Sequence, residues 1–214
     1  MNMNRRDFFR WAGASAAILG LTAADLQNLD KVFAAAGSPP VIWLQGASCS
    51  GCSVSLLNSV NPTIDDVLLN KISMKYHPNL NAGAGDLAIG AVTGTQTSYS
   101  GQYILVVEGA IPTGANGKYC TIGQKNGVEW TIYDAVRQLA PRAARVVAVG
   151  TCAAFGGIPA AGTNALGVKS VKAVLGNTVS RPVINLPSCP AHPGVMVGTL
   201  VDLILGVNLT LDSQ

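Results

Sequence analysis

Cysteines are the residues of this 214-residue chain best suited to carry chemistry. Cys49 and Cys52 lie three positions apart in the glycine- and serine-rich stretch GASCSGCS. Cys152 occurs in VVAVGTCAAFGG, and Cys189 occurs in VINLPSCPAHP. Thiols at such spacings can form disulfides, act as a redox dithiol, or bind a metal ion or an iron–sulfur cluster. Which chemistry applies depends on whether the fold brings the four cysteines together.

Apolar segments predict the strands that position these cysteines. The predicted strands are residues 41–45, 71–77, 103–109, 145–150 and 181–187. Helical patterns follow over 53–60, with Ser53 as the N-cap, and over 86–92, 128–140 and 194–206, whereas the glycine-rich stretch NLNAGAGDLAIG is typical of a loop. Strands that are apolar on both faces and alternate with helices favour a parallel sheet covered on both sides. We therefore expect an α/β fold, a flavodoxin-like doubly wound parallel sheet in a single domain.

Each of the four cysteines directly follows a predicted strand. The first strand precedes Cys49 and Cys52, the fourth precedes Cys152, and the fifth precedes Cys189. Loops that follow parallel strands emerge at the carboxyl edge of the sheet, where such folds bind their ligands. The four thiols should therefore converge on this edge.

Four converging thiolates fit either tetrahedral zinc or an iron–sulfur cluster. Structural zinc usually takes two close pairs of cysteines, whereas Cys152 and Cys189 come singly from separate loops, which favours a larger cubane. Nearby glycines would let the backbone approach a cluster closely; they are Gly46, Gly51, Gly156 and Gly157. Two disulfides in an oxidising compartment, or a thioredoxin-like dithiol, are the alternatives.

Other candidate residues give weaker signals. Cys120 follows no strand directly, and we expect it to be a partly buried free thiol. His77 ends a predicted strand and is expected to be a structural hydrogen-bonding residue. His192 lies in the same loop as Cys189 and has the same expected role, with a hydrogen bond to a cluster sulfur as the alternative.

The first 36 residues have the plan of an export signal. An arginine pair, Arg5 and Arg6, precedes two phenylalanines, a moderately apolar stretch over 11–21 and three alanines at 34–36. This resembles a twin-arginine signal, which directs export of folded proteins, and residues 37–214 would form the mature domain. No run of 18 uncharged apolar residues occurs in the rest of the chain, so no transmembrane helix is predicted. A net charge of only +3 gives no reason to expect nucleic-acid binding.

Motifs in a fixed order suggest a family. CSGCSVSLLNSV, VEGAIP, GTCAAFGG and INLPSCPAHP follow the export signal, and together they resemble the small subunits of periplasmic nickel–iron hydrogenases. The first motif is particularly similar to the nickel–iron–selenium branch. The resemblance implies a flavodoxin-like domain in which Cys49, Cys52, Cys152 and Cys189 hold one proximal 4Fe–4S cluster. It also implies a hydrogenase in which this chain transfers electrons and has no catalytic residue, while a partner large subunit holds the nickel–iron centre.

Some positions depart from the family pattern. Gly51 and Gly157 occupy places where oxygen-tolerant relatives carry further cysteines, so an ordinary four-cysteine cluster is expected. Ser48 and Val54 stand where many members have glutamates. Glu108, in VEGAIP, matches a loop near the subunit interface and is assigned no chemistry. The chain also ends where typical members continue into a domain with medial and distal clusters, so we expect a short form with one cluster.

The resemblance also implies partners and a location. The expected partners are the hydrogenase large subunit, across an apolar interface at the cysteine edge, and either a further electron-transfer subunit or a cytochrome c. The expected location is the periplasm, with membrane association through a partner as a variant. The alternatives are an exported flavodoxin-like redox module, a quinone-oxidoreductase-type iron–sulfur subunit and a non-redox exported binding protein.

Overall fold

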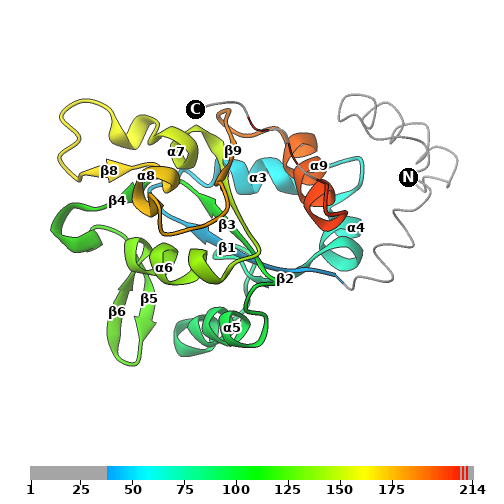
Figure 1. Cartoon of the computed structure of the whole chain (residues 1–214), viewed down its shortest axis with the longest axis horizontal. Helices are drawn as coiled ribbons and strands as arrows, with labels where there is room; N and C mark the ends of the chain where they lie inside the picture. The colour runs from blue at the N-terminus through cyan, green and yellow to red at the C-terminus, as the bar shows by residue number, and fades with distance from the viewer. Residues whose placement is uncertain (1–37, 208, 210, 212–214) are drawn as a thin grey trace, which may run out of the picture.

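A central parallel sheet organises the protein (Figure 1). The computed structural model describes residues 38–207, 209 and 211, so the predicted export signal lies outside the described residues. The sheet has the strand order β2-β1-β3-β7-β9. Its strands are β1 (Pro40–Gln45), β2 (Ser73–Tyr76), β3 (Ile104–Glu108), β7 (Arg145–Val149) and β9 (Ile184–Leu186). All five predicted strands are confirmed, in the order typical of flavodoxin-like folds.

The strands bury both faces because apolar residues occupy consecutive positions. In β1, Val41 and Trp43 pack into one hydrophobic core, while Ile42 and Leu44 pack into the other. All five residues of β3 are buried. A strand that is apolar on both faces requires helices above and below it. The doubly wound prediction is therefore confirmed.

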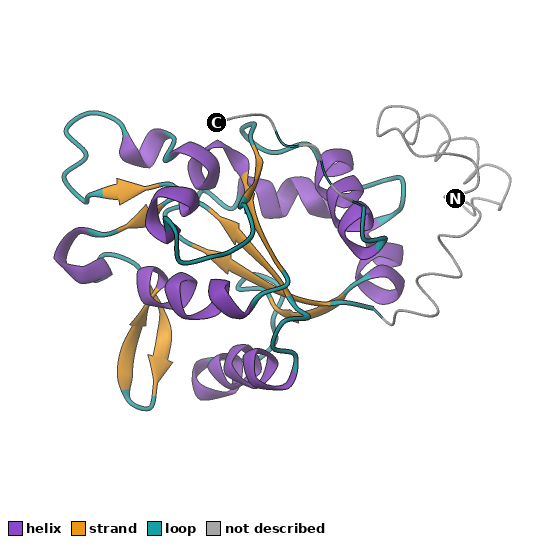
Figure 2. Ribbon diagram, viewed as in Figure 1, coloured by secondary structure: helices purple, strands orange, loops and turns teal. Residues whose placement is uncertain are grey.

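Helices cover both faces of the sheet (Figure 2). One face carries α3 (Gly51–Leu57), α4 (Ile64–Asp66), the π-helix η1 (Val67–Lys71) and α9 (Pro193–Ile204). The other face carries α5 (Gly85–Ser98), α6 (Ile132–Leu139), α7 (Gly150–Phe155) and α8 (Val171–Leu175). The 3-10 helices are η2 (Gly114–Gly117), η3 (Ala140–Arg142) and η4 (Ile158–Ala160). Among the described residues, no helix is long and apolar enough to cross a membrane.

The start of α3 differs from the prediction. Ser50, in the left-handed conformation with φ 61°, is the N-cap residue, and the helix begins at Gly51. The predicted N-cap, Ser53, is instead a buried residue inside the helix. The helix starts early because the left-handed turn at Ser50 already reverses the chain after β1.

Residues 128–140 are not one helix, as the pattern predicted. Strand β6 (Val128–Thr131) pairs antiparallel with strand β5 (Thr121–Lys125). Helix α6 begins only after Thr131, whose Oγ1 caps the helix by accepting a hydrogen bond of 3.0 Å from the Asp134 amide. Asn126 and Gly127 have φ angles of 54° and 75°, as a two-residue hairpin turn requires. The Asn–Gly pair was the overlooked sequence signal.

Two further elements were missed or misplaced. Helix α5 runs over 85–98, which confirms the predicted helix over 86–92 but extends it, so the second half of the glycine-rich stretch is helical rather than a loop. A second small sheet pairs β4 (Ile111–Pro112) with β8 (Val168–Lys169). Both lie outside the five-stranded sheet, where the sequence pattern carries the least information about tertiary contacts.

Candidate functional site

The carboxyl edge of the sheet carries all four candidate cysteines. Cys49 lies between β1 and α3, Cys52 in the first turn of α3, Cys152 in the first turn of α7 after β7, and Cys189 between β9 and α9. The charges of Cys49 and Cys189 both act on Cys52 and on Cys152. Cys49 and Cys189 thus each lie within Coulombic range of both Cys52 and Cys152, while the assignment of all four thiols to one site stays a prediction.

Glycines make room for three of the four sulfur atoms. A Cβ atom added to Gly150 would lie 2.6 Å from Cys52 Sγ, and one added to Gly157 would lie 2.8 Å from Cys152 Sγ. A Cβ atom on Gly51 would lie 3.1 Å from Cys49 Sγ. These contacts bear out the expectation for Gly51 and Gly157 that backbone comes close to the site, and they add Gly150 to it.

Two of the singled-out glycines have a different role. A Cβ atom on Gly46 would collide with the Ala110 carbonyl oxygen, and one on Gly156 would lie 2.8 Å from Ala160 Cβ. Gly46 thus allows close packing between the ends of β1 and β3, and Gly156, with φ 96°, ends helix α7. Neither has a sulfur atom as its nearest neighbour.

The four thiols differ in exposure, and burial disfavours ionisation of Cys52 and Cys152. Cys52 is buried, Cys152 is half-buried, and Cys49 and Cys189 are exposed. Burial raises the pKa of Cys52 to about 11, and the charges of Glu108, Cys49 and Cys189 contribute. Burial also raises the pKa of Cys152, and the nearby thiols add to it. To be thiolates at neutral pH, these groups need a positively charged centre beside them.

Backbone amides point toward two of the sulfur atoms. The Ala191 N–H donates to Cys52 Sγ at 3.5 Å, and the backbone amide of Ile158 donates to the Cys152 thiol. Such donors favour the thiolate form and oppose the effect of burial. They are also the contacts by which proteins tune the sulfur ligands of iron–sulfur clusters.

The candidate donors are free thiols in this structure. All five cysteines are free, so no disulfide pairs them in this structure. In the part of the chain that the structure describes, no three His, Cys, Asp or Glu side chains lie close enough together to hold a single metal ion. Zinc would need its thiolates about 2.3 Å from one point. In a cubane cluster each cysteine binds a different iron atom, and the assignment of these four cysteines to such a cluster stays a prediction.

Glu108, at the end of β3, is the important residue of this edge that the sequence did not reveal. Its side chain is only 1% exposed. Oε1 accepts hydrogen bonds from the backbone N–H groups of Cys52 at 3.0 Å and Ser53 at 3.2 Å. Oε2 accepts from Trp43 Nε1 at 3.1 Å, from Gln45 Nε2 at 2.9 Å and from the Ser53 hydroxyl. An acidic residue ending the apolar strand ILVVE was the available signal.

His77 extends this arrangement away from the cysteines. Its Nδ1 accepts a hydrogen bond of 3.1 Å from the Asn79 amide, so the ring proton lies on Nε2 and points to Ser53 Oγ at 3.2 Å. The ring lies 5.1 Å from the Trp43 ring, centroid to centroid. We call Trp43, Gln45, Ser53, His77 and Glu108 the Glu108 network. Its His77 is a buried hydrogen-bonding residue, as predicted.

Opposing effects set the pKa values in the Glu108 network. Burial alone would raise the pKa of Glu108, but the donors on Ser53, Gln45 and Trp43 outweigh burial and hold the pKa below its ordinary value. Burial lowers the pKa of His77, against the opposing charge of Glu108. The network therefore pairs an ionised carboxylate with a neutral imidazole.

The two remaining candidates do not join the site. His192 is exposed, and its Nδ1 accepts a 3.1 Å hydrogen bond from the Gly194 amide at the start of α9, a structural role as predicted. Its alternative role toward a sulfur atom stays a prediction. Cys120 is a half-buried free thiol, as expected, and packs against the hydrophobic core.

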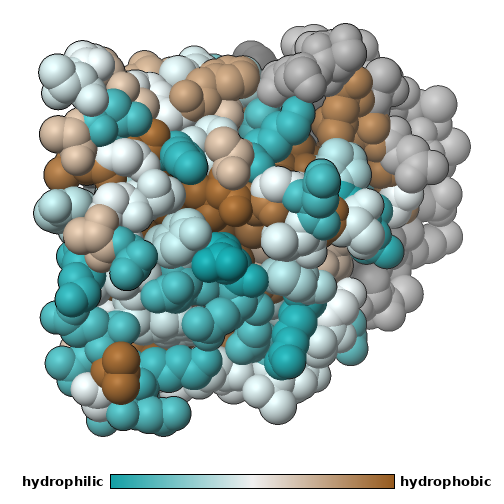
Figure 3. All heavy atoms as spheres, turned by 60° about the vertical axis from the view of Figure 1, so that its left-hand side comes forward, coloured by the Kyte–Doolittle hydropathy of each residue, from teal (hydrophilic) through white to brown (hydrophobic). Residues whose placement is uncertain are grey.

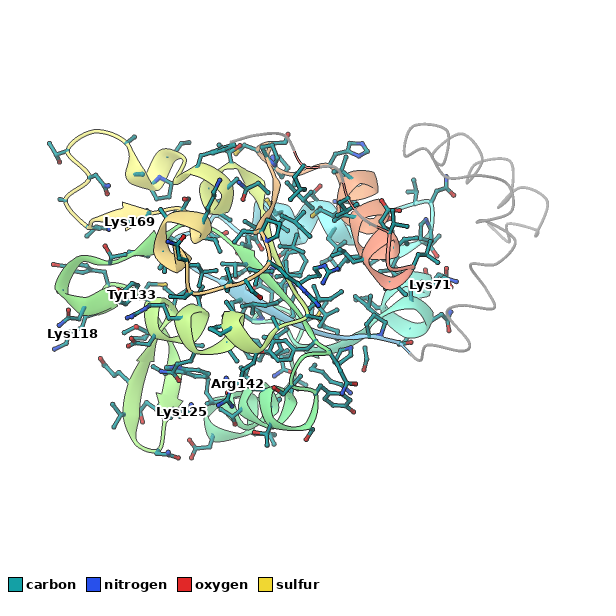
Figure 4. The ribbon with its side chains drawn as sticks, in the orientation of Figure 1. Lys71, Lys118, Lys125, Tyr133, Arg142 and Lys169 are labelled. Carbon is teal, nitrogen blue, oxygen red and sulfur yellow. The ribbon has the colours of Figure 1, made fainter. Side chains whose placement is uncertain are left out.

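Exposed apolar side chains flank the cysteines. They come from α3, from the end of α7, from η4 and from the start of α9, and they are Val54, Phe155, Ile158 and Val195. Figure 3 shows one face of the molecule on which apolar side chains gather in the middle and upper part, above a mainly hydrophilic lower part. In Figure 4 the labelled Lys118 and Lys169 lie at the left of the molecule and Lys71 at the right, while Lys125 and Arg142 lie in its lower part.

Comparison with known proteins places this edge in a family. The family model described as "NADH ubiquinone oxidoreductase, 20 Kd subunit" matches residues 49–203, a range that begins at Cys49 and includes the other three candidate cysteines. The chain belongs to this family. The match starts at the candidate site itself and extends to the end of α9.

Hydrogenase small subunits are among its relatives. The chain is 41% identical to the periplasmic NiFeSe hydrogenase small subunit of Desulfomicrobium baculatum, over 94% of this chain and 66% of the relative. It is 37% identical to the hydrogenase-2 small chain of Escherichia coli K12, over 94% of this chain and 52% of that relative. A solved NiFeSe hydrogenase from Desulfovibrio vulgaris Hildenborough superposes with a TM-score of 0.75 and 50% identity, over 77% of this chain and 58% of that one. The resemblance found in the sequence is thus confirmed, and the chain spans between half and two thirds of these relatives' length.

Proposed function

We propose that this chain is the electron-transfer small subunit of a nickel–iron hydrogenase. In this proposal Cys49, Cys52, Cys152 and Cys189 hold one proximal 4Fe–4S cluster. The observation that supports it is the position of four free thiols just after the carboxyl ends of three parallel strands, at one edge of the sheet. The homology to hydrogenase small subunits supports the same assignment.

A bound cluster would supply one-electron transfer, and this chain's own residues would define its surroundings. The cysteines would bind it, and Gly150 and Gly157 would leave space for the ligand sulfur atoms. The amides of Ala191 and Ile158 would stabilise two thiolates. Electrons would pass between a large subunit, which holds the nickel–iron centre, and an external acceptor.

The large subunit would bind over the cysteine edge. Two of the four thiols are exposed there, and a partner that covers them would exclude water from the cluster. The flanking residues Val54, Phe155 and Ile158 offer the apolar surface that a permanent interface requires. The relative from Desulfomicrobium baculatum is named a periplasmic hydrogenase small subunit. This name supports a periplasmic location for the chain, in line with the predicted twin-arginine signal.

A second candidate follows from the family description, which names an NADH ubiquinone oxidoreductase subunit. In that case the same four cysteines would serve a quinone-reducing complex without nickel. Nickel in the purified complex distinguishes the two candidates.

The test is to purify the complex through a tag on this chain and to measure nickel, iron and acid-labile sulfide. Cys152→Ser is compared with Cys120→Ser, a matched change of another partly buried thiol. We expect iron, sulfide and a nickel-containing large subunit with the unaltered chain and with Cys120→Ser, and loss of about one four-iron cluster with Cys152→Ser. Equal iron in both variants, or a complex without iron, would contradict the proposal.

A further inference from the structure

The Glu108 carboxylate lies directly behind the candidate cluster ligands. Its Oε1 is 3.0 Å from the backbone nitrogen of Cys52, and its charge acts on both Cys52 and Cys152. Coulombic interactions are strong inside a protein because the surroundings screen them less than water does. A charge at this position must therefore be felt at the cysteine edge.

All five donors to this carboxylate are electrically neutral. They are the backbone amides of Cys52 and Ser53, the indole of Trp43, the side-chain amide of Gln45 and the Ser53 hydroxyl. Neutral donors stabilise an anion without cancelling its net charge. The network thus keeps a full negative charge buried in place.

A carboxylate is a costly way to satisfy two backbone amides. A neutral acceptor could accept the same hydrogen bonds with less desolvation. Three further side chains contribute donors to Oε2, and His77 in turn donates to Ser53 Oγ. Because so many donors hold one carboxylate, we infer that its negative charge has a role at the cysteine edge, in addition to fixing the start of helix α3.

We propose that Glu108 sets a fixed negative charge beside the cluster ligands and so keeps the reduction potential of the cluster low, with Ser53 and His77 as positioning residues. Reduction adds an electron to a group that its four thiolates already make negative, and a nearby anion disfavours this step. The inference rests on the proposed function, because it requires a cluster at the four cysteines.

The test uses the intact complex and measures the midpoint potential by a redox titration followed by electron paramagnetic resonance. The relevant signal is the one that Cys152→Ser removes. Glu108→Gln deletes the charge and should favour the reduced cluster about tenfold, a positive shift of about 59 mV for one electron. Ser53→Ala keeps the carboxylate but removes a donor from it, so a smaller negative shift is expected.

Glu129→Gln is the control, because it removes the same charge from the exposed β5–β6 hairpin, away from the cysteine edge. Its potential should match that of the unaltered complex. An unchanged potential in Glu108→Gln, or shifts of the same sign in Glu108→Gln and Ser53→Ala, would overturn the inference. If Glu108→Gln fails to assemble, the Ser53→Ala variant is the test, and an unchanged or more positive midpoint potential in that variant would overturn the inference. Absence of any cluster signal from the unaltered complex would instead refute the proposed function.

Discussion

The sulfur atom of Cys52 occupies the space that a side chain at position 150 would need. Gly150 is also held at φ 84°, where residues with a Cβ atom are strained. Two separate requirements, backbone conformation and room for a ligand, therefore meet in one residue. The two requirements can be separated by comparison with a glycine that has a positive φ angle but no neighbouring sulfur atom.

Gly150→Ala should displace the Cys52 sulfur and lower the iron content of the purified complex. Gly101→Ala is the matched control, because Gly101 has φ 79° and no atom within 4 Å of an added Cβ. Each change should cost about 1 kcal/mol of unfolding free energy from backbone strain, measured by urea denaturation. Only Gly150→Ala should lose iron, and equal iron in both variants would show that the close contact is unimportant.

The positions of single residues could be predicted where the order of the strands along the chain determines them. The cysteines could be placed at one edge because each directly follows a strand, which needs only the chain order and the parallel topology. Glu108 could not, because its donors come from β1 and α3, and no spacing in the sequence shows that these groups meet the end of β3. His77 was recognised as a hydrogen-bonding residue, but its partner Ser53 was taken for a helix cap.

At the scale of elements, α9 carries a buried acidic residue on a helix that otherwise packs apolar residues against the sheet. Asp202 is 5% exposed, and its Oδ1 has no hydrogen-bond partner in the described part of the chain. Burial raises its pKa above the ordinary value of 3.8. Because the folded chain holds this proton more tightly, stability falls as pH rises through the window between the ordinary and the raised pKa.

Asp202→Asn should therefore stabilise the protein at pH 7, by about 1 kcal/mol of unfolding free energy. The gain should shrink as pH falls through the raised pKa and vanish well below the ordinary value of 3.8, where the carboxyl group is protonated in both states. Thermal unfolding of both proteins across this pH range is the measurement. Asp86→Asn, an exposed change in α5, should show no such pH-dependent gain. A gain that is constant with pH would show that charge is not the cause.

The predicted elements were most accurate where hydrophobic burial decides the structure. All five core strands were found, since continuous apolar runs must be covered on both faces. The boundary between β6 and α6 was missed because Trp130, Ile132 and Val136 fit a helical pattern as well as a strand followed by a helix. The Asn126–Gly127 turn resolves that ambiguity, and it is a local signal that outweighs the apolar periodicity.

At the scale of the whole molecule, exposed apolar side chains lie beside the cysteine edge. Ile158, next to Cys152 and 82% exposed, is the most exposed large apolar residue of the described chain. A surface of this kind favours association through burial of apolar area rather than through charge. The proposed complex with a large subunit should accordingly survive high salt.

Ile158→Glu should abolish or strongly weaken co-purification of the large subunit, because it would bury a charge in the interface. Leu69→Glu is the matched control: Leu69 is 78% exposed, but it lies in η1 before the start of β2, at the opposite edge of the sheet. Pull-down from cells at low and high salt is the measurement. Equal loss in both variants would point to general destabilisation, and equal retention would place the interface elsewhere.

The candidate ligands follow three strands of the sheet, among them the first and the last in chain order. Cys49 and Cys52 follow β1, near the middle of the sheet, while Cys189 follows β9, an edge strand of only three residues. A cofactor bound to all of them would act as a cross-link between segments more than 130 residues apart, restricting the unfolded chain much as a long-range disulfide does. Cofactor insertion would then have to wait until the last strand is synthesised and docked, and its removal would loosen the edge of the sheet before its centre.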